Sequence, residues 1–339
     1  MGLRLSRLNG YNAMSDSDPI GLITWLAQRL NDLPLAYLYL MRADLLGQQQ
    51  GDVLPPARQH FRGSQRGDRR HLPQPRSRRL HRLPHPGALV MSVVSTTTGL
   101  VFRPAAERFH SQLDWLDSWH SFSFSSHFDP AWMGFGPLRV INDDTIAPGR
   151  GFGMHPHSDM EIITVMVEGQ LNHRDSMGHA EVLRAGEVQR MSAGTGVVHS
   201  EINGGDRPCR LLQIWIEPSS SGIAPAYEQK PFAIGAGWTP LLDPSEAAGA
   251  MAIHRPVRLW RAQPHPGTAL ELPLAPGSQG WLQVIEGAMT LTGLSSPGAG
   301  GLPQQLQRGD GLGLAAEAAA GAVLREAVAG TDLLLYELR

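Results

Sequence analysis

The stretch EIITVMVEGQLNH, residues 161–173, indicates the fold class of the chain. Residues 161–167 are mostly β-branched, residues 168–169 form an acid–glycine turn, and residues 170–173 resume an extended pattern. This order predicts a β-hairpin. Further strands of the same texture are expected at residues 138–141, 188–191 and 211–216. Because the connections are short, the pattern is typical of an antiparallel β-barrel or sandwich.

A weak internal repeat extends this pattern to the rest of the chain. The repeated segments are VMVEGQLNH (165–173) with QVIEGAMTL (283–291), and LRAGEVQRM (183–191) with LQRGDGLGL (306–314). The offsets are 118 and 123 residues, so the two copies differ by a five-residue insertion. We therefore expect an all-β protein with two tandem barrels, over residues 91–225 and 226–339.

The first 90 residues differ from the rest in composition. They hold thirteen arginines against six aspartates, whereas residues 91–339 hold sixteen basic and twenty-five acidic residues. Residues 20–42 are expected to be helical, and residues 20–63, which include LPLAYLYLMRADLLGQQQ, resemble a fragment of an old yellow enzyme barrel. Such a fragment cannot bury its own apolar face, and residues 64–90 lack any periodicity. We expect residues 1–90 to be a poorly structured, non-functional extension. For residues 58–90 the alternative is a basic nucleic-acid-binding arm.

Two short motifs carry the chemistry of the chain. MHPHSD places His155 and His157 at i and i+2, and HSE does the same for His199 and Glu201. On a strand, each such pair lies on one face. Two pairs on neighbouring strands aim four ligands at one point, and imidazole with carboxylate suits iron, nickel, manganese, copper or zinc. We therefore expect these four residues to bind one divalent transition metal inside a barrel.

Residues from about 100 to 339 resemble the pirin family, a bicupin group of the cupin superfamily. The segments that carry the resemblance are DWLDSWHSFSF (114–124), MGFGPLRVINDD (133–144), GFGMHPHSDMEI (151–162), MSAGTGVVHSEIN (191–203) and QIWIEP (213–218). The resemblance implies two jelly-roll cupins with a single metal in the first. It also implies the ligands His155, His157, His199 and Glu201, with Fe(II) as the first choice of ion and Ni, Mn, Cu or Zn as alternatives.

Glu161 is a second candidate for the carboxylate ligand of the metal. In many cupins the carboxylate ligand follows the first histidine pair by four residues, which is Glu161 here, whereas pirin-like proteins use the position of Glu201. We expect Glu201 to be the ligand and proton acceptor, and Glu161 to lie on the same face and orient an imidazole N–H. In the second barrel His254 and His265 are isolated, so that barrel is expected to be metal-free and structural.

Several other residues are expected to play structural roles. His173 and His179 flank a turn and are expected to face solvent, and residues 142–144 (Asn-Asp-Asp) are expected to make turn hydrogen bonds. The tryptophans expected either to line a substrate entrance or to fill a core are Trp115, Trp119 and Trp132.

The resemblance leaves two functions open. Some bacterial pirin-like proteins cleave quercetin, which implies a metal-dependent dioxygenase acting on an aromatic small molecule such as a flavonol. Animal pirins are nuclear proteins that bind transcription-factor partners, which implies instead a non-enzymatic, iron-binding redox sensor acting through a protein partner. The same four ligands serve both functions, so the motif does not separate them.

Charge and hydropathy narrow the range of partners. The acidic composition of residues 91–339 argues against direct nucleic-acid binding. No 18-residue apolar span and no secretory signal are visible, so we expect a cytoplasmic monomer without membrane contact. The single cysteine excludes a disulfide framework within the chain.

Overall fold

The computed structural model describes residues 2–6, 37–41, 100–295 and 305–339. The chain divides into two units, Met1–Leu89 and Val90–Arg339. In the first unit, β1 (Gly2–Ser6) and β2 (Tyr37–Met41) pair in parallel. The expectation of a helix over residues 20–42 is therefore wrong at Tyr37–Met41, where alternating aromatic and aliphatic residues favour a strand. The remainder of that expectation and the basic stretch of residues 64–90 lie outside the described residues.

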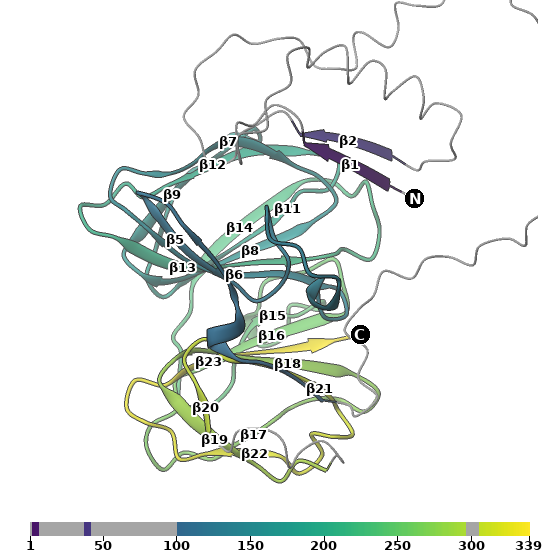
Figure 1. Cartoon of the computed structure of the whole chain (residues 1–339), viewed down its shortest axis with the longest axis vertical. Helices are drawn as coiled ribbons and strands as arrows, with labels where there is room; N and C mark the ends of the chain where they lie inside the picture. The colour runs from purple at the N-terminus through teal and green to yellow at the C-terminus, as the bar shows by residue number, and fades with distance from the viewer. Residues whose placement is uncertain (1, 7–36, 42–99, 296–304) are drawn as a thin grey trace, which may run out of the picture. The chain divides into compact units, whose positions relative to one another are not determined.

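The second unit contains a first barrel made of two facing sheets (Figure 1). One sheet has four strands in the order β10-β9-β12-β7, and the other has seven in the order β14-β11-β8-β13-β6-β5-β4. The strands are β4 (Phe109–Gln112), β5 (Leu116–His120), β6 (Leu138–Ile146), β7 (Gly151–His157), β8 (Glu161–Glu168), β9 (Gln170–Asp175), β10 (Ala180–Arg184), β11 (Glu187–Ser192), β12 (Val197–Ile202), β13 (Cys209–Ile216) and β14 (Ala226–Pro231).

A second barrel follows, so the expected all-β fold of two cupin barrels is confirmed. Its sheets have the orders β15-β16-β23-β18-β21-β3 and β17-β22-β19-β20. The strands are β3 (Leu100–Arg103), β15 (Thr239–Leu242), β16 (Val257–Ala262), β17 (Leu270–Glu271), β18 (Gln279–Glu286), β19 (Ala288–Thr292), β20 (Gln305–Gln307), β21 (Gly311–Ala315), β22 (Val323–Arg325) and β23 (Asp332–Leu338). Within the described residues, no helix has the length and hydrophobicity of a membrane span.

The two barrels exchange strands at their edges. β3 precedes the first barrel in the chain but pairs with β21 of the second, and β14 follows residue 225 but pairs with β11 of the first. The strand pairing therefore differs from the expected division at residues 225/226 in both places. The physical reason is that β11 and β21 would otherwise be open sheet edges, with unpaired backbone N–H and C=O groups.

The repeat seen in the sequence corresponds to two equivalent hairpins, β8–β9 and β18–β19. Their turns contain Gly169 at φ +74° and Gly287 at φ +72°, a conformation that side chains rarely adopt. A Cβ at Gly169 would lie 2.9 Å from Cys209 Cβ, and one at Gly287 would lie 2.7 Å from Thr331 Cα. Both turns therefore require glycine for conformation as well as for space.

An apolar core joins the seven-stranded sheet of the first barrel to the six-stranded sheet of the second (Figure 1). Alternation along β8 sends Ile163 and Val165 into this core, where they cluster with Trp281 and Tyr336 of the second barrel. The intervening residues of β8 therefore face the interior of the first barrel. This alternation decides which side chains of β8 are able to reach a site inside the first barrel.

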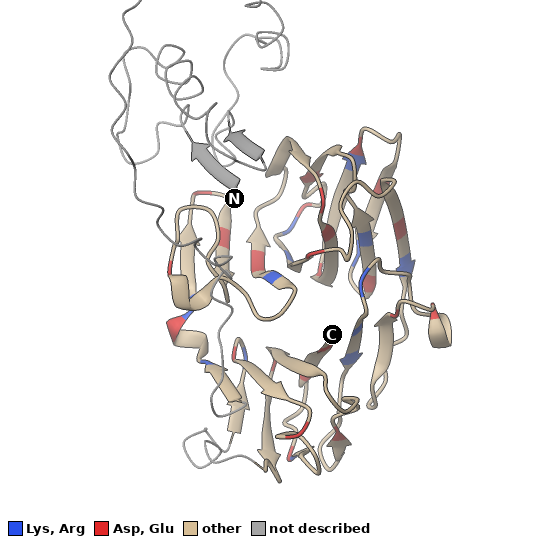
Figure 2. Cartoon of the chain, turned by 90° about the vertical axis from the view of Figure 1, so that its right-hand side faces the viewer, with Lys and Arg blue, Asp and Glu red and all other residues tan. Residues whose placement is uncertain are grey.

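Ion pairs also cross between the barrels. Arg210 on β13 donates to both carboxylate oxygens of Asp143, at 2.8 and 3.0 Å, and to Glu286 of the second barrel at 2.8 Å. Acidic and basic positions are interspersed along the strands of both barrels (Figure 2). Residues 142–144 thus lie within β6 and not in a turn, so that expectation was wrong. A run of three polar residues suggested a turn. In the strand, their side chains alternate between the interior of the first barrel and the ion pairs of Arg210.

Candidate metal centre

The site is built on the inward face of β12, which lies between β7 and β9. His199 is directly opposite His155 on β7 and opposite Asp175 on β9. The register with β7 then shifts by a β-bulge, so Glu201 lies opposite Phe152 on that side and opposite His173 on β9. Bulges often occur beside functional sites because they redirect a side chain.

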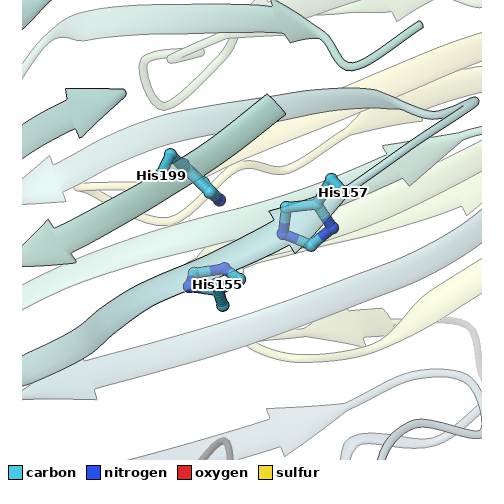
Figure 3. A group of neighbouring side chains, drawn as sticks. All are labelled: His155, His157 and His199. Atoms are coloured by element: carbon cyan, nitrogen blue, oxygen red, sulfur yellow. The ribbon is translucent and has the colours of Figure 1, made fainter. Parts of the chain in front are cut away.

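Three of the four expected ligands converge. His155, His157 and His199 each offer one ligand atom within 4.8 Å of the other two. Their ring centroids are 4.4 to 4.9 Å apart, and Figure 3 shows the imidazoles gathered between β7 and β12. Ligand nitrogens that bind one ion at about 2.0–2.1 Å each lie a few ångströms apart, so this spacing fits a common metal.

The hydrogen bonds of these histidines leave nitrogens free for a metal. His155 Nδ1 is 2.7 Å from the carbonyl oxygen of Gly153. A carbonyl only accepts, so Nδ1 carries the proton and Nε2 retains its lone pair. Both ring nitrogens of His199 are buried and have no hydrogen-bond partner in the protein. Buried polar atoms without partners are rare in folded proteins, and a metal would satisfy one of them.

Burial keeps two histidines of this cluster, His157 and His199, neutral. Desolvation, followed by the neighbouring imidazoles His199 and His155, lowers the pKa of His157 to about 3. Desolvation, followed by His155 and His173, lowers the pKa of His199 to about 2. The neutral imidazole is the form that binds a metal, so the barrel interior favours metal binding over protonation.

Glu201 belongs to a second group that shares His199. One ligand atom each of His173, His199 and Glu201 lies within 4.8 Å of the others. The Glu201 carboxylate is buried and accepts hydrogen bonds from Gln213 Nε2, at 2.9 and 3.2 Å, and from Thr164 Oγ1 at 3.3 Å. The four expected residues therefore lie on one sheet but form two overlapping groups, with His173 as an addition.

Glu161 points away from this site. Its carboxylate accepts from Ser192 Oγ at 2.8 Å and pairs with His254 Nδ1 at 3.0 Å. It alternates in phase with Ile163, which lies in the core between the barrels. The expectation that Glu161 shares the face of the metal ligands is therefore wrong, and His254 is not isolated. The residue of β8 that reaches the site is Thr164.

Besides Thr164, sequence reasoning missed three residues that contact the cluster: His173, Gln213 and Trp215. His173 was expected to face solvent but is 1% exposed, and Gln213 binds Glu201. The Trp215 ring centroid is 4.9 Å from that of His157, and its Nε1 is buried without a hydrogen-bond partner. His173 and Asp175 have the same i, i+2 spacing as the recognised motifs, a signal that the sequence did contain.

The tryptophans considered for a substrate entrance have other partners. Trp115 packs edge-on against Phe152, with ring centroids 5.3 Å apart. Trp119 stacks on His110, and Trp132 lies beneath the guanidinium of Arg103. None of these three tryptophans makes a described ring contact with the metal cluster, whereas Trp215 does.

Fold and site together define a bicupin protein with a histidine-rich centre in its first barrel. Residues 102–216 match the family model described as Pirin, and residues 241–338 match the one described as Quercetinase C-terminal cupin domain. The chain is 44% identical to quercetin 2,3-dioxygenase of Escherichia coli (strain K12), over 60% of this chain and 88% of that protein. The chain belongs to the pirin family.

Further relatives agree with this assignment. A pirin-like protein of Caulobacter vibrioides is 40% identical, over 60% of this chain and 85% of the relative. The crystal structure of YhhW from Escherichia coli aligns with a TM-score of 0.64 and 40% identity, over 71% of this chain and 97% of that one. A second crystal structure of YhhW, a bacterial pirin, is in complex with nickel(II) and has the same TM-score.

Proposed function

We propose that this protein is a metal-dependent dioxygenase that cleaves a flavonol such as quercetin with O2. The observation that carries the proposal is the cluster of His155, His157 and His199 on the sheet that also holds the carboxylate of Glu201. Burial lowers the pKa values of His157 and His199, which keeps these two imidazoles neutral. The relatives named quercetin 2,3-dioxygenase support the reaction class.

We propose His155, His157, His199 and Glu201 as the metal ligands. The unpartnered buried nitrogens of His199 support this choice, and three imidazoles with one carboxylate suit a divalent transition metal. Fe(II) is the first ion to test, followed by nickel, which the related YhhW binds. The ion would supply a Lewis acid that lowers the pKa of a bound hydroxyl, together with the redox chemistry of O2.

We assign Glu201 as the group that accepts the proton of the substrate hydroxyl. The amide of Gln213 and the hydroxyl of Thr164 hold this carboxylate by hydrogen bonds, so its orientation is set before substrate binds. Each carboxylate oxygen has two lone pairs, so Glu201 is able to accept a further proton donor. Glu161 is excluded from this role because it faces the other side of the sheet.

The exposure of the cluster indicates where a substrate would enter. His157 is half-buried, whereas His155 and His199 are buried. Beside His157 stands Trp215, whose ring is edge-on both to His157 and to Phe124, with centroids 4.9 and 5.5 Å apart. These rings offer apolar faces to a planar aromatic substrate. The unpartnered Nε1–H of Trp215 is available to donate to a substrate oxygen.

The test uses the full chain loaded separately with iron, nickel or copper. Quercetin is added under O2, and loss of flavonol absorbance is followed together with release of carbon monoxide. We expect turnover with at least one metal, and loss of both metal and turnover in His199→Ala. The matched control, His265→Ala, alters an exposed histidine of the second barrel and is expected to keep both. A fully metal-loaded protein without turnover would contradict the dioxygenase proposal and favour the sensor alternative.

A further inference from the structure

We propose that His173 is a positioning residue of the metal centre, whose Nδ1 accepts the N–H of His199 when the other nitrogen of His199 binds the ion. This inference rests on the metal centre proposed above and leaves its four ligands unchanged. His199 is common to the two groups of ligand atoms described above. Its ring centroid is 4.4 Å from that of His155 and 5.4 Å from that of His173.

The sheet places His199 between the histidines of β7 and His173. Its strand, β12, pairs on one side with β7, which carries His155 and His157, and on the other with β9, which carries His173. A ring nitrogen of His173 and one of His199 lie within 4.8 Å of each other. His173 is 1% exposed and stacks on Tyr227, with ring centroids 4.7 Å apart, so packing holds its ring in one plane.

Asp175 leaves the Nδ1 of His173 as an acceptor. Asp175 Oδ2 is 3.0 Å from His173 Nε2. Burial acts to raise the pKa of Asp175, but its hydrogen bonds with His173 and His179 outweigh burial and leave the pKa lowered. An ionised carboxylate only accepts, so Nε2 carries the proton and Nδ1 of the neutral ring carries a lone pair. Nδ1 is buried and has no hydrogen-bond partner in the protein.

His199 supplies the matching donor. Its pKa is lowered to about 2, first of all by desolvation, so its ring is neutral and has one N–H and one lone pair. If the lone pair binds the metal, the N–H stays in the barrel interior, where a donor without an acceptor is costly. Neither ring nitrogen of His199 has a hydrogen-bond partner in the structure. The proposal therefore requires this ring to turn towards His173 as the metal binds.

The other acceptor side chains beside His199 are occupied. Asp175 is directly opposite His199 across the β9–β12 ladder. Its two oxygens already take four hydrogen bonds, from the ring nitrogens of His173 and His179 and from two backbone N–H groups. A carboxylate has about four lone pairs, so Asp175 has none left. Glu201 takes three hydrogen bonds and is itself a proposed ligand. Of these side chains, within the part of the chain that the structure describes, His173 Nδ1 is the acceptor that remains.

The proposal gives a chain of hydrogen bonds that runs from Asp175 through His173 to His199 and ends at the metal. A histidine ligand commonly donates its other N–H to an acceptor, which fixes its tautomer and ring orientation and makes it a stronger ligand. Loss of such an acceptor typically lowers metal affinity or activity by about 10- to 100-fold. His173 is therefore expected to affect metal affinity without binding the metal.

The test compares His173→Leu, which removes the acceptor, with His173→Asn, whose amide oxygen lies near the place of Nδ1. The control is His179→Gln, because His179 binds the same Asp175 oxygen and stacks on the same tyrosine. Zinc affinity of the full chain is measured by competition with a chelator. Pulsed electron paramagnetic resonance on the copper(II) form counts the coordinated imidazoles.

We expect His173→Leu to bind zinc about tenfold or more weakly, with an unchanged imidazole count. His173→Asn should recover most of the lost affinity, and His179→Gln should bind zinc like the wild type. Three results would overturn the proposal: wild-type affinity in His173→Leu, equal losses in His173→Leu and His173→Asn, or one coordinated imidazole fewer in His173→Leu.

A measurement on the unaltered protein remains informative if the variants do not fold. In the zinc form with 15N-labelled histidine, an N–H···N hydrogen bond produces a scalar coupling between the protonated nitrogen of His199 and His173 Nδ1. We expect this coupling to be observed. If zinc is bound and the coupling is absent, this inference fails and the metal centre stands. If the folded wild-type protein binds no metal at all, the metal centre and this inference fail together.

Discussion

The interiors of the two barrels differ although their hairpins repeat. In the first copy of the repeat, Thr164, His173 and Gln189 face inward around the metal centre, and each is buried. At the offsets of 118 and 123 residues, the second copy has leucine at all three positions. The equivalent residues are Leu282, Leu291 and Leu312. Leu282 and Leu312 belong to the apolar core of the second barrel, and the partly buried Leu291 packs against it.

This difference shows that the fold does not require a polar interior. Apolar packing fills the core of the second barrel, where Val284, Leu314 and Leu333 are buried in the same cluster as Leu282 and Leu312. The first barrel instead buries polar atoms that have no hydrogen-bond partner, including Gln189 Nε2, His173 Nδ1 and both ring nitrogens of His199. Such atoms destabilise a fold. Local departures of this kind from the rules of packing are expected at functional sites.

The largest loss of stability is expected when a polar residue of the first barrel is placed at the equivalent position of the second. Leu282→Thr removes packing and buries a hydroxyl, so it should lower the free energy of unfolding by about 2–4 kcal/mol. The reciprocal change, Thr164→Val, keeps the volume and loses only hydrogen bonds of 3.3 and 3.4 Å, so about 1 kcal/mol is expected. Denaturant unfolding of the metal-free proteins measures both. Equal losses would show that the two interiors are not distinguished by polarity.

An intermediate loss of stability is expected from a side chain added where β7 closely approaches β12. Gly151 has φ +153°, and a Cβ there would lie 2.2 Å from the backbone oxygen of Glu201. Gly151→Ala should therefore cost about 1–3 kcal/mol and weaken metal binding, because β12 must shift. Gly153, on the same strand, has no atom within 4 Å of an added Cβ. In thermal unfolding and metal titration, Gly153→Ala should have the stability and metal affinity of the wild type. Equal losses in the two variants would contradict this account of β7.

The third prediction, whose effect is the smallest within any one pH unit, is a pH dependence of unfolding that arises from His120 of the first barrel. Desolvation, only partly offset by the hydrogen bond to Asn142, lowers the pKa of His120 to about 4. As pH falls from about 6.5 towards 4, the unfolded chain binds a proton that the folded protein does not. The free energy of unfolding should therefore fall with pH, by up to about 1.4 kcal/mol per pH unit for this group.

His120→Gln removes this contribution while retaining a polar side chain. Unfolding of the metal-free wild type and variant should be compared at several pH values from 7 to 4. The other histidines titrate in both proteins, so the difference in slope isolates His120. Parallel pH profiles would show that burial of His120 does not affect its protonation.

Local patterns account for most of what sequence reasoning predicted. The alternation in residues 161–173 and the repeat at 118 and 123 residues predicted the hairpins and the two barrels. The i, i+2 spacing of the two histidine motifs predicted three side chains that converge in the structure. These predictions succeed because strand periodicity and glycine turns depend on neighbours along the chain.

Predictions failed where a side chain's role depends on another strand. Glu161 follows the first motif closely, yet the alternation of β8 turns it towards His254 of the second barrel. Residues 142–144 resemble a turn, yet β13 pairs with them along β6. β3 was expected in the first barrel, yet it pairs with β21 of the second, whose edge offers backbone hydrogen-bond partners. None of these contacts is encoded in local spacing.

The sequence by itself determined an all-β bicupin chain with a histidine cluster in the first copy of its repeat. Only the tertiary structure decided which side chains come together at that cluster. The β-bulge between His199 and Glu201, and the register that sets Glu201 opposite His173, depend on how β7, β12 and β9 pair. A shift of one residue along a strand reverses the face of every side chain, so ligand sets follow from register, which the sequence specifies only through the whole fold.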